Sequence, residues 1–95
     1  MMALETVPFD PAEFLDSPQA QAEYLSLSMA EDDPAEIAAA LGVVARARGM
    51  SAVARDSGLG RESLYKSLSE NGNPELATVL KVLRSMGLKL TVQPA

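Results

Sequence analysis

The sequence predicts an all-α domain of five short helices that ends in a short C-terminal β-strand. Apolar residues recur at helical spacing between breaks marked by Pro and Gly, and several breaks carry side chains that cap helices. Near the C-terminus the pattern changes to the alternation that is typical of a strand. The chain has 95 residues and is 47% hydrophobic, which is enough for one modest core.

Each of the first two helices has a capping side chain followed by proline. Ser17 and Pro18 predict a helix over residues 18–30, with Tyr24, Leu25 and Met29 on its buried side.

The second helix starts from Asp33 and Pro34, where Glu36 completes a capping box. Its core positions recur at helical spacing and are Ile37, Leu41, Val44 and Ala45. Gly49 is expected to end this helix.

The third and fourth helices are predicted over residues 52–57 and 61–70, with Ser51 as the cap of the third. Gly58, Leu59 and Gly60 lie between them. Two short helices would therefore flank a turn of three residues.

The fifth helix is predicted to start from Asn73 and Pro74 and to end at Gly87. Apolar residues at positions i, i+3, i+4 and i+7 predict its buried stripe, formed by Leu76, Val79, Leu80 and Leu83.

Residues 88–92 alternate between apolar and polar side chains, and Pro94 ends the pattern. A lone strand cannot satisfy its own backbone groups, so it needs a second edge. The same strand of a second copy would supply one and make a homodimer. The alternatives are a tail folded on its own domain or pairing with the N-terminal segment.

The charge is divided unevenly along the chain. Residues 1–36 hold nine acidic side chains and no Lys or Arg, whereas residues 37–95 have a net charge of +4. We therefore expect two regions, an acidic, partly helical N-terminal extension over residues 1–33 and a domain over residues 34–95 that includes the C-terminal strand. The asymmetry fits a protein with one polyanionic and one cationic partner, or two differently solvated faces of one domain.

Several function classes are excluded by what the sequence lacks. There is no Cys or His, which rules out disulfides, a Cys/His zinc site and a histidine general base. There is also no phosphate-binding glycine loop. We expect no cofactor, no metal and no enzymatic activity. The sequence has no apolar run that could span a membrane and no basic start of a secretory signal, so we expect a cytoplasmic protein.

The spacing in residues 50–69 predicts a helix-turn-helix unit that binds double-stranded DNA. This motif needs a small residue where the helices cross, a Gly four positions later for the turn, and apolar residues that hold the second helix on the first. These structural roles fit five residues: Ala54, Gly58, Leu59, Leu64 and Leu68.

If Leu64 and Leu68 face inward, the second helix turns polar side chains outward. Arg61 fits guanine, Glu62 fits cytosine, and Tyr65 fits a methyl group or a phosphate. Lys66 and the first backbone amides of the helix fit phosphate. The full set of predicted DNA-binding residues is Ser51, Arg61, Glu62, Ser63, Tyr65, Lys66 and Ser69. The alternative is an ordinary solvated helix face.

Three arginines flank this unit: Arg46, Arg48 and Arg55. They either extend a basic footprint along the DNA backbone or form salt bridges to the acidic N-terminal part.

The combined string of motifs resembles the addiction-module antidote proteins, antitoxins of the Cro/repressor-type helix-turn-helix class. The resemblance runs from about Phe9 to Val92. It is carried by Phe9-Asp10, Tyr24-Leu25, Ala40-Leu41-Gly42, residues 45–50, Gly58-Leu59, residues 61–66, residues 72–74 and residues 88–90. One departure is Gly60, where the family commonly has Ser, and glycine at this position gives up a side-chain cap.

The resemblance implies a Cro/repressor-like fold and a bacterial antitoxin that neutralises a small basic toxin of the RelE/ParE type. It also implies repression of the shared promoter through operator DNA. On this interpretation residues 1–36 contribute to toxin binding. The alternatives are a prophage-type transcriptional regulator without a toxin partner and a protein-interaction module that does not bind DNA.

Overall fold

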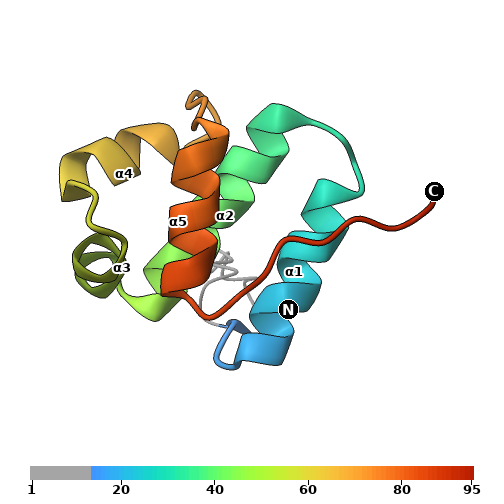
Figure 1. Ribbon diagram of the computed structural model, residues 1–95, viewed down its shortest axis with the longest axis horizontal. Coiled ribbons are helices and arrows are strands. Elements are labelled where there is room, and N and C mark those ends of the chain that lie inside the picture. The colour runs from blue at the N-terminus through green and yellow to red at the C-terminus, as the bar shows by residue number, and fades with distance from the viewer. Residues whose placement is uncertain (1–13) are drawn as a thin grey trace, which may run out of the picture.

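The computed structural model describes residues 14–95, and this part of the chain contains five helices and no strand (Figure 1). The helices are α1 (Pro18–Met29), α2 (Pro34–Arg48), α3 (Met50–Ser57), α4 (Arg61–Ser67) and α5 (Leu76–Ser85). The predicted helical fold is therefore confirmed at the level of helix number and order.

Helix α2 lies near the centre of the arrangement, with α1 along one side and α3 and α4 on the other (Figure 1). Helix α5 packs against α3 and closes the core. The buried apolar cluster takes residues from all five helices, including Leu25, Leu41, Val53, Leu64 and Val82. One core therefore holds α1 together with the helices that follow it, while residues 1–13 of the acidic N-terminal part lie outside the described residues.

The predicted starts of the first two helices are confirmed, but the capping box expected at the second is not formed, because no hydrogen bond among the described residues joins the Glu36 side chain to the Asp33 amide. The Ser17 hydroxyl accepts a hydrogen bond from the Ala20 amide at 3.1 Å, and the Asp33 carboxylate accepts one from the Ala35 amide at 3.0 Å. Proline occupies the beginning of both helices. Gly49, with a φ of +101°, ends α2 as expected.

A buried amide joins α1 to α2. The Gln21 side chain donates to the Leu15 carbonyl at 3.0 Å and accepts from the Arg48 guanidinium at 3.4 Å. Gln21 is buried, so these bonds replace the water that its amide would otherwise contact.

Three predicted boundaries are wrong. Helix α3 begins at Met50, so Ser51 lies inside its first turn and does not cap it. Helix α4 ends at Ser67 because Leu68 leaves the helical conformation. Helix α5 begins at Leu76, since the backbone of Glu75 is still extended and no side chain caps this end.

The predicted buried stripe of α5 is only partly right, because Val79 and Leu83 pack in the core but Leu76 and Leu80 do not. Leu76 is 64% exposed and Leu80 is 42% exposed, whereas Val82, Leu83 and Met86 are buried. The observed stripe is Val79, Val82, Leu83 and Met86, which has the same spacing moved three residues along the helix. The face of α5 that packs on the core is thus rotated about the helix axis by about 60° from the predicted face.

The strand expected over residues 88–92 is not formed within the single chain. After Gly87 the chain runs as an extended segment from the end of α5 across α1, and its end projects beyond α1 (Figure 1). No second strand exists among the described residues, so no ladder forms within residues 14–95.

No single helix in the described range is both long enough and apolar enough to cross a membrane. Helices α2 and α3 meet those criteria only when they are counted together, and they are bent by 103° at their junction.

Candidate nucleic-acid interface

The turn between α3 and α4 is built on a left-handed glycine. Gly58 has a φ of +75°, and its amide donates to the Ala54 carbonyl at 3.0 Å, which ends α3. Gly60 is extended, and its carbonyl accepts from the Leu64 amide at 3.0 Å at the start of α4. The chain thus reverses within three residues and presents α4 beside α3.

Apolar contacts hold the two helices together. Leu64 and Leu68 are buried in the same core cluster as Met50 and Val53 from α3. Ala54 and Leu59 are partly buried against the same cluster. The burial of Leu64 and Leu68 therefore determines which side of α4 faces the core, and the opposite side is exposed to solvent.

The outward side of α4 carries side chains that can read base edges or bind phosphate. Five of the seven predicted DNA-binding residues lie exposed together on this short helix: Arg61, Glu62, Ser63, Tyr65 and Lys66. They offer two cationic groups, one carboxylate and two hydroxyls.

Arg61 and Tyr65 form a pair one helical turn apart. The Arg61 guanidinium lies 5.6 Å from the centroid of the Tyr65 ring, and its Nη2 donates to the Tyr65 hydroxyl at 3.5 Å. This long hydrogen bond is weak, but together with the ring contact it orients the arginine along the exposed side of α4.

The two serines at the ends of the predicted set lie elsewhere. Ser51 is exposed in the first turn of α3. Ser69 follows the end of α4, is half-buried, and donates its hydroxyl to the Lys66 carbonyl at 3.1 Å. Ser69 therefore closes the C-terminal end of α4 and does not share the helix face of Arg61.

The partners of Arg55 and Arg48 lie within the described part of the chain. Arg55 forms an ion pair with Asp56 at 3.1 Å, with both side chains largely exposed. Arg48 is bonded to the neutral amide of Gln21. Because Asp56 and Glu62 lie among the cations, the exposed side of α3 and α4 has mixed charge.

Two further residues position this part of the fold and were not predicted from the sequence. Gly42 in α2 lies directly against the backbone of Leu68. The sequence indicates such a close contact only by placing a glycine in the interior of a helix. Gln21 fixes Arg48 from a different helix, and nothing in the local sequence indicates that contact.

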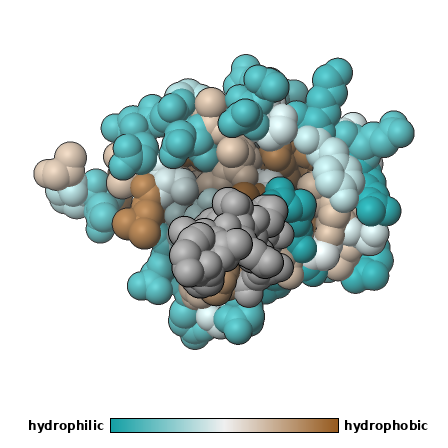
Figure 2. Space-filling model, turned by 180° about the vertical axis from the view of Figure 1, so that it is seen from behind, coloured by the Kyte–Doolittle hydropathy of each residue, from teal (hydrophilic) through white to brown (hydrophobic). Residues whose placement is uncertain are grey.

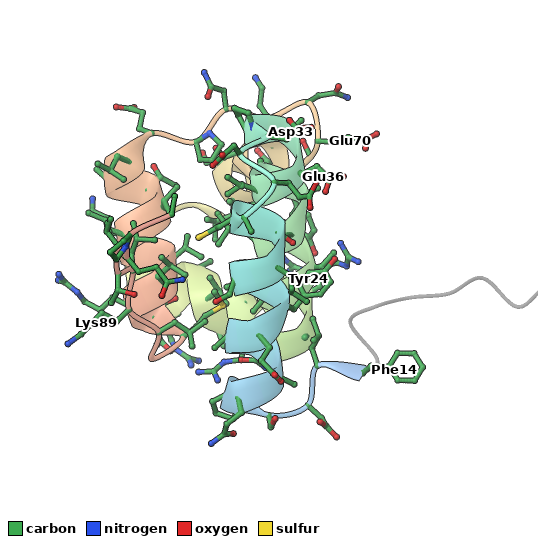
Figure 3. The ribbon with its side chains drawn as sticks, turned by 90° about the vertical axis from the view of Figure 1, so that its right-hand side faces the viewer. Phe14, Tyr24, Asp33, Glu36, Glu70 and Lys89 are labelled. Carbon is green, nitrogen blue, oxygen red and sulfur yellow. The ribbon has the colours of Figure 1, made fainter. Side chains whose placement is uncertain are left out.

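A second exposed surface is strongly acidic. Asp33 and Glu36, at the start of α2, lie at the same end of the molecule as Glu70, while Lys89 lies on another side (Figure 3). On the outer face of α1, Leu27 is 72% exposed, and Glu23 precedes it by one helical turn. Figure 2 shows the reverse of the molecule, which away from its grey atoms is mostly hydrophilic.

Comparison with known proteins assigns the family. A family described as "Probable addiction module antidote protein" matches residues 5–94, which is nearly the whole chain. An uncharacterised protein of Haemophilus influenzae is 49% identical over 85 residues, covering 90% of this chain and 88% of the relative. No solved structure matches.

The chain therefore belongs to the family of probable addiction module antidote proteins. An antidote of this kind implies a toxin as its partner.

Proposed function

We propose that the protein is the antitoxin of a type II toxin-antitoxin module, which neutralises a small basic toxin of the RelE/ParE type in the cytoplasm. We further propose that it represses its own operon by binding operator DNA as a homodimer. The observation that carries the DNA-binding role is the exposed set of polar side chains on α4, held outward by the burial of Leu64 and Leu68.

In this proposal α3 and α4 act as a Cro/repressor-type helix-turn-helix unit, and α4 enters the major groove. Arg61, the first residue of α4, binds a guanine edge, and the Glu62 carboxylate accepts a hydrogen bond from cytosine. Lys66, Ser63 and Ser51 bind the phosphate backbone, together with the free amides at the start of α4. Tyr65 orients Arg61 and adds a phosphate or methyl contact.

Operator binding is tested with a labelled duplex from the region upstream of the gene, using fluorescence anisotropy at several salt concentrations. Arg61→Ala is expected to weaken binding by about 1–3 kcal/mol, or roughly 5- to 150-fold. Lys66→Ala is expected to lower affinity and reduce the salt slope by about 1.

Lys81→Ala is the matched control, because Lys81 is exposed on α5, outside the proposed interface. Affinity that is insensitive to salt, or equal losses for Lys66→Ala and Lys81→Ala, would contradict the assignment of α4 to DNA.

The proposed toxin surface is the outer face of α1 with the start of α2. All acidic side chains of the described part of this region are exposed: Asp16, Glu23, Glu31, Asp32, Asp33 and Glu36. Leu27 adds an exposed apolar centre to this acidic rim. An apolar centre with a charged rim suits a protein partner, and the sign of the rim suits a basic one.

Toxin binding is tested by co-expressing the protein with the product of the adjacent reading frame and measuring growth. The double substitution Glu23→Lys and Glu31→Lys is expected to abolish rescue and to leave operator affinity close to that of the wild type. Glu75→Lys, an exposed charge reversal at the start of α5, is expected to preserve rescue. If the adjacent product is not toxic, the antitoxin role is wrong and a regulator without a toxin partner remains.

A further inference from the structure

The extended segment after α5 exposes apolar side chains, and beyond Leu88 its backbone groups have no backbone partner among the described residues. Val92 is 96% exposed and Leu90 is 39% exposed. Within the described chain no backbone hydrogen bond joins residues 89–95 to any other residue. An exposed, extended segment of this kind is a template for pairing with another strand.

The start of the segment determines which of its edges is free. Gly87 is left-handed, with a φ of +71°, and the Leu88 amide donates to the Leu83 carbonyl at 2.9 Å. Neighbouring residues of an extended chain direct their N–H and C=O groups to opposite edges. The edge of Leu88 is therefore directed at α5, and the opposite edge carries the backbone groups of Lys89 and Thr91.

We propose that residues 88–92 pair antiparallel with the same residues of a second copy, with the two-fold axis at Leu90. Lys89 then lies opposite the partner's Thr91, and these residues exchange the backbone hydrogen bonds of the free edge. Leu90 lies opposite the partner's Leu90, and Leu88 lies opposite the partner's Val92. This inference rests on the homodimer proposed above, but not on DNA binding or toxin binding.

The proposed register brings all the apolar residues of the segment together. In an antiparallel pair the side chains of a non-hydrogen-bonded pair are the closer ones, and these positions would hold Leu88, Leu90 and Val92. The register also keeps the two copies of Lys89 from lying directly opposite each other, which would be destabilising.

The surroundings of the segment favour a second copy over the basic toxin. Shallow grooves border the segment against α1 and α5, and both include Leu83, Leu88 and Leu90 in their walls. The exposed side of α5 continues this apolar surface through Leu76 and Leu80. Its exposed charges are the cations Lys81 and Arg84, followed by Lys89 in the segment. These would repel a basic protein, whereas a second copy has a net charge of −5.

The absence of cysteine from the chain makes the register directly testable by cross-linking. Single cysteines are placed at Leu90, at Thr91 and, as a control for random collision, at the exposed Ala77 of α5. Under mild oxidation Leu90→Cys is expected to form a disulfide-linked dimer at least tenfold faster than the other two, because its two Cβ atoms are close enough for a disulfide. Faster cross-linking of Thr91→Cys would overturn the register, and equal rates for all three would overturn the pairing.

A second measurement avoids introduced thiols. Sedimentation of the full chain is expected to give a dimer, and Val92→Glu is expected to weaken dimerisation by at least tenfold. Because Val92 is almost fully exposed in one copy, this substitution leaves the fold intact, which helical circular dichroism would verify. A monomeric wild-type chain, or a Val92→Glu variant that dimerises as well as the wild type, would overturn the proposal whether or not the protein binds DNA or a toxin.

Discussion

The carbonyl oxygen of Leu68 occupies the space that a side chain at Gly42 would need. A Cβ built on Gly42 would overlap that oxygen, and it would also lie 3.2 Å from the carbonyl carbon of Leu68. Helix α2 thus touches the backbone at the end of α4 directly, without a side chain between them. This contact sets how far α4 stands from the centre of the fold.

Gly42→Ala is therefore expected to destabilise the protein, although alanine is the better helix former. In an open helix interior the same change would stabilise by about 0.5–1 kcal/mol. Overpacking against a backbone group is expected to cost about 1–3 kcal/mol instead. Thermal unfolding of the wild type and the variant shows whether the substitution stabilises or destabilises the protein. A higher Tm for the variant would show that α4 moves away from α2 without loss of stability.

Substitution of Gly58 tests the turn that precedes α4. Nothing lies within 4 Å of a Cβ at this position, so the cost of a side chain arises from the left-handed backbone alone. Gly58→Ala is expected to lower the unfolding free energy by about 1–2 kcal/mol. Gly58→Asn should recover part of that loss in urea titrations, because asparagine tolerates this conformation. Equal losses for both variants would point to a steric cause.

The buried amide of Gln21 predicts a stability effect far from the proposed interface. Gln21→Leu leaves the Leu15 carbonyl without its donor, which is expected to cost about 1–3 kcal/mol. Gln19→Leu, on the exposed side of the same helix, is the control and is expected to stay within about 0.5 kcal/mol. Similar unfolding free energies for the two variants would mean that the Gln21 bonds contribute nothing.

The contact between Arg61 and Tyr65 predicts a graded effect on operator affinity. Tyr65→Phe retains the ring under the guanidinium and removes only the hydroxyl, whereas Tyr65→Ala removes both. An exposed cation–π contact contributes about 0.5–1 kcal/mol, so Tyr65→Ala is expected to lose roughly 2- to 5-fold more affinity than Tyr65→Phe. Equal affinities of the two variants in anisotropy titrations would leave Tyr65 without a positioning role.

The predicted and the observed buried stripes of α5 imply different losses of unfolding free energy when the residues at its two ends, Leu76 and Met86, are truncated. Met86 is fully buried, so Met86→Ala is expected to cost about 2–5 kcal/mol. Leu76→Ala removes a side chain that is mostly exposed and should change the unfolding free energy by no more than about 0.5 kcal/mol. A larger loss of unfolding free energy for Leu76→Ala than for Met86→Ala would support the buried stripe that was predicted from the sequence.

Helix α5 also illustrates what the sequence cannot decide. Leu76, Val79, Leu80 and Leu83 have the same spacing as the buried set that starts three residues later. Both sets satisfy a helical period, and the packing of α5 against α3 selects between them. By contrast, the starts of α1 and α2 were predictable because Ser17 and Asp33 act within three residues of their own positions.

The candidate interface was predictable for the same reason. The outward set on α4 follows from the burial of Leu64 and Leu68, which a local period reveals. Ser69 departs from the prediction because α4 ends earlier than its composition indicates. Gln21 and Leu68 act through contacts with residues more than 20 positions away, which no local pattern contains.

The order in which the helices pack has a kinetic consequence. Helix α1 packs on α2, α2 on α3, and α3 on α4, so most partners are neighbours along the chain. Helix α4 also contacts α2, and α5 reaches back past α4 to meet α3. Helical domains with such short sequence separations fold in microseconds to milliseconds, because little chain entropy is lost before contacts form. The chain can therefore assemble pair by pair as it leaves the ribosome, with the docking of α5 as the closing event.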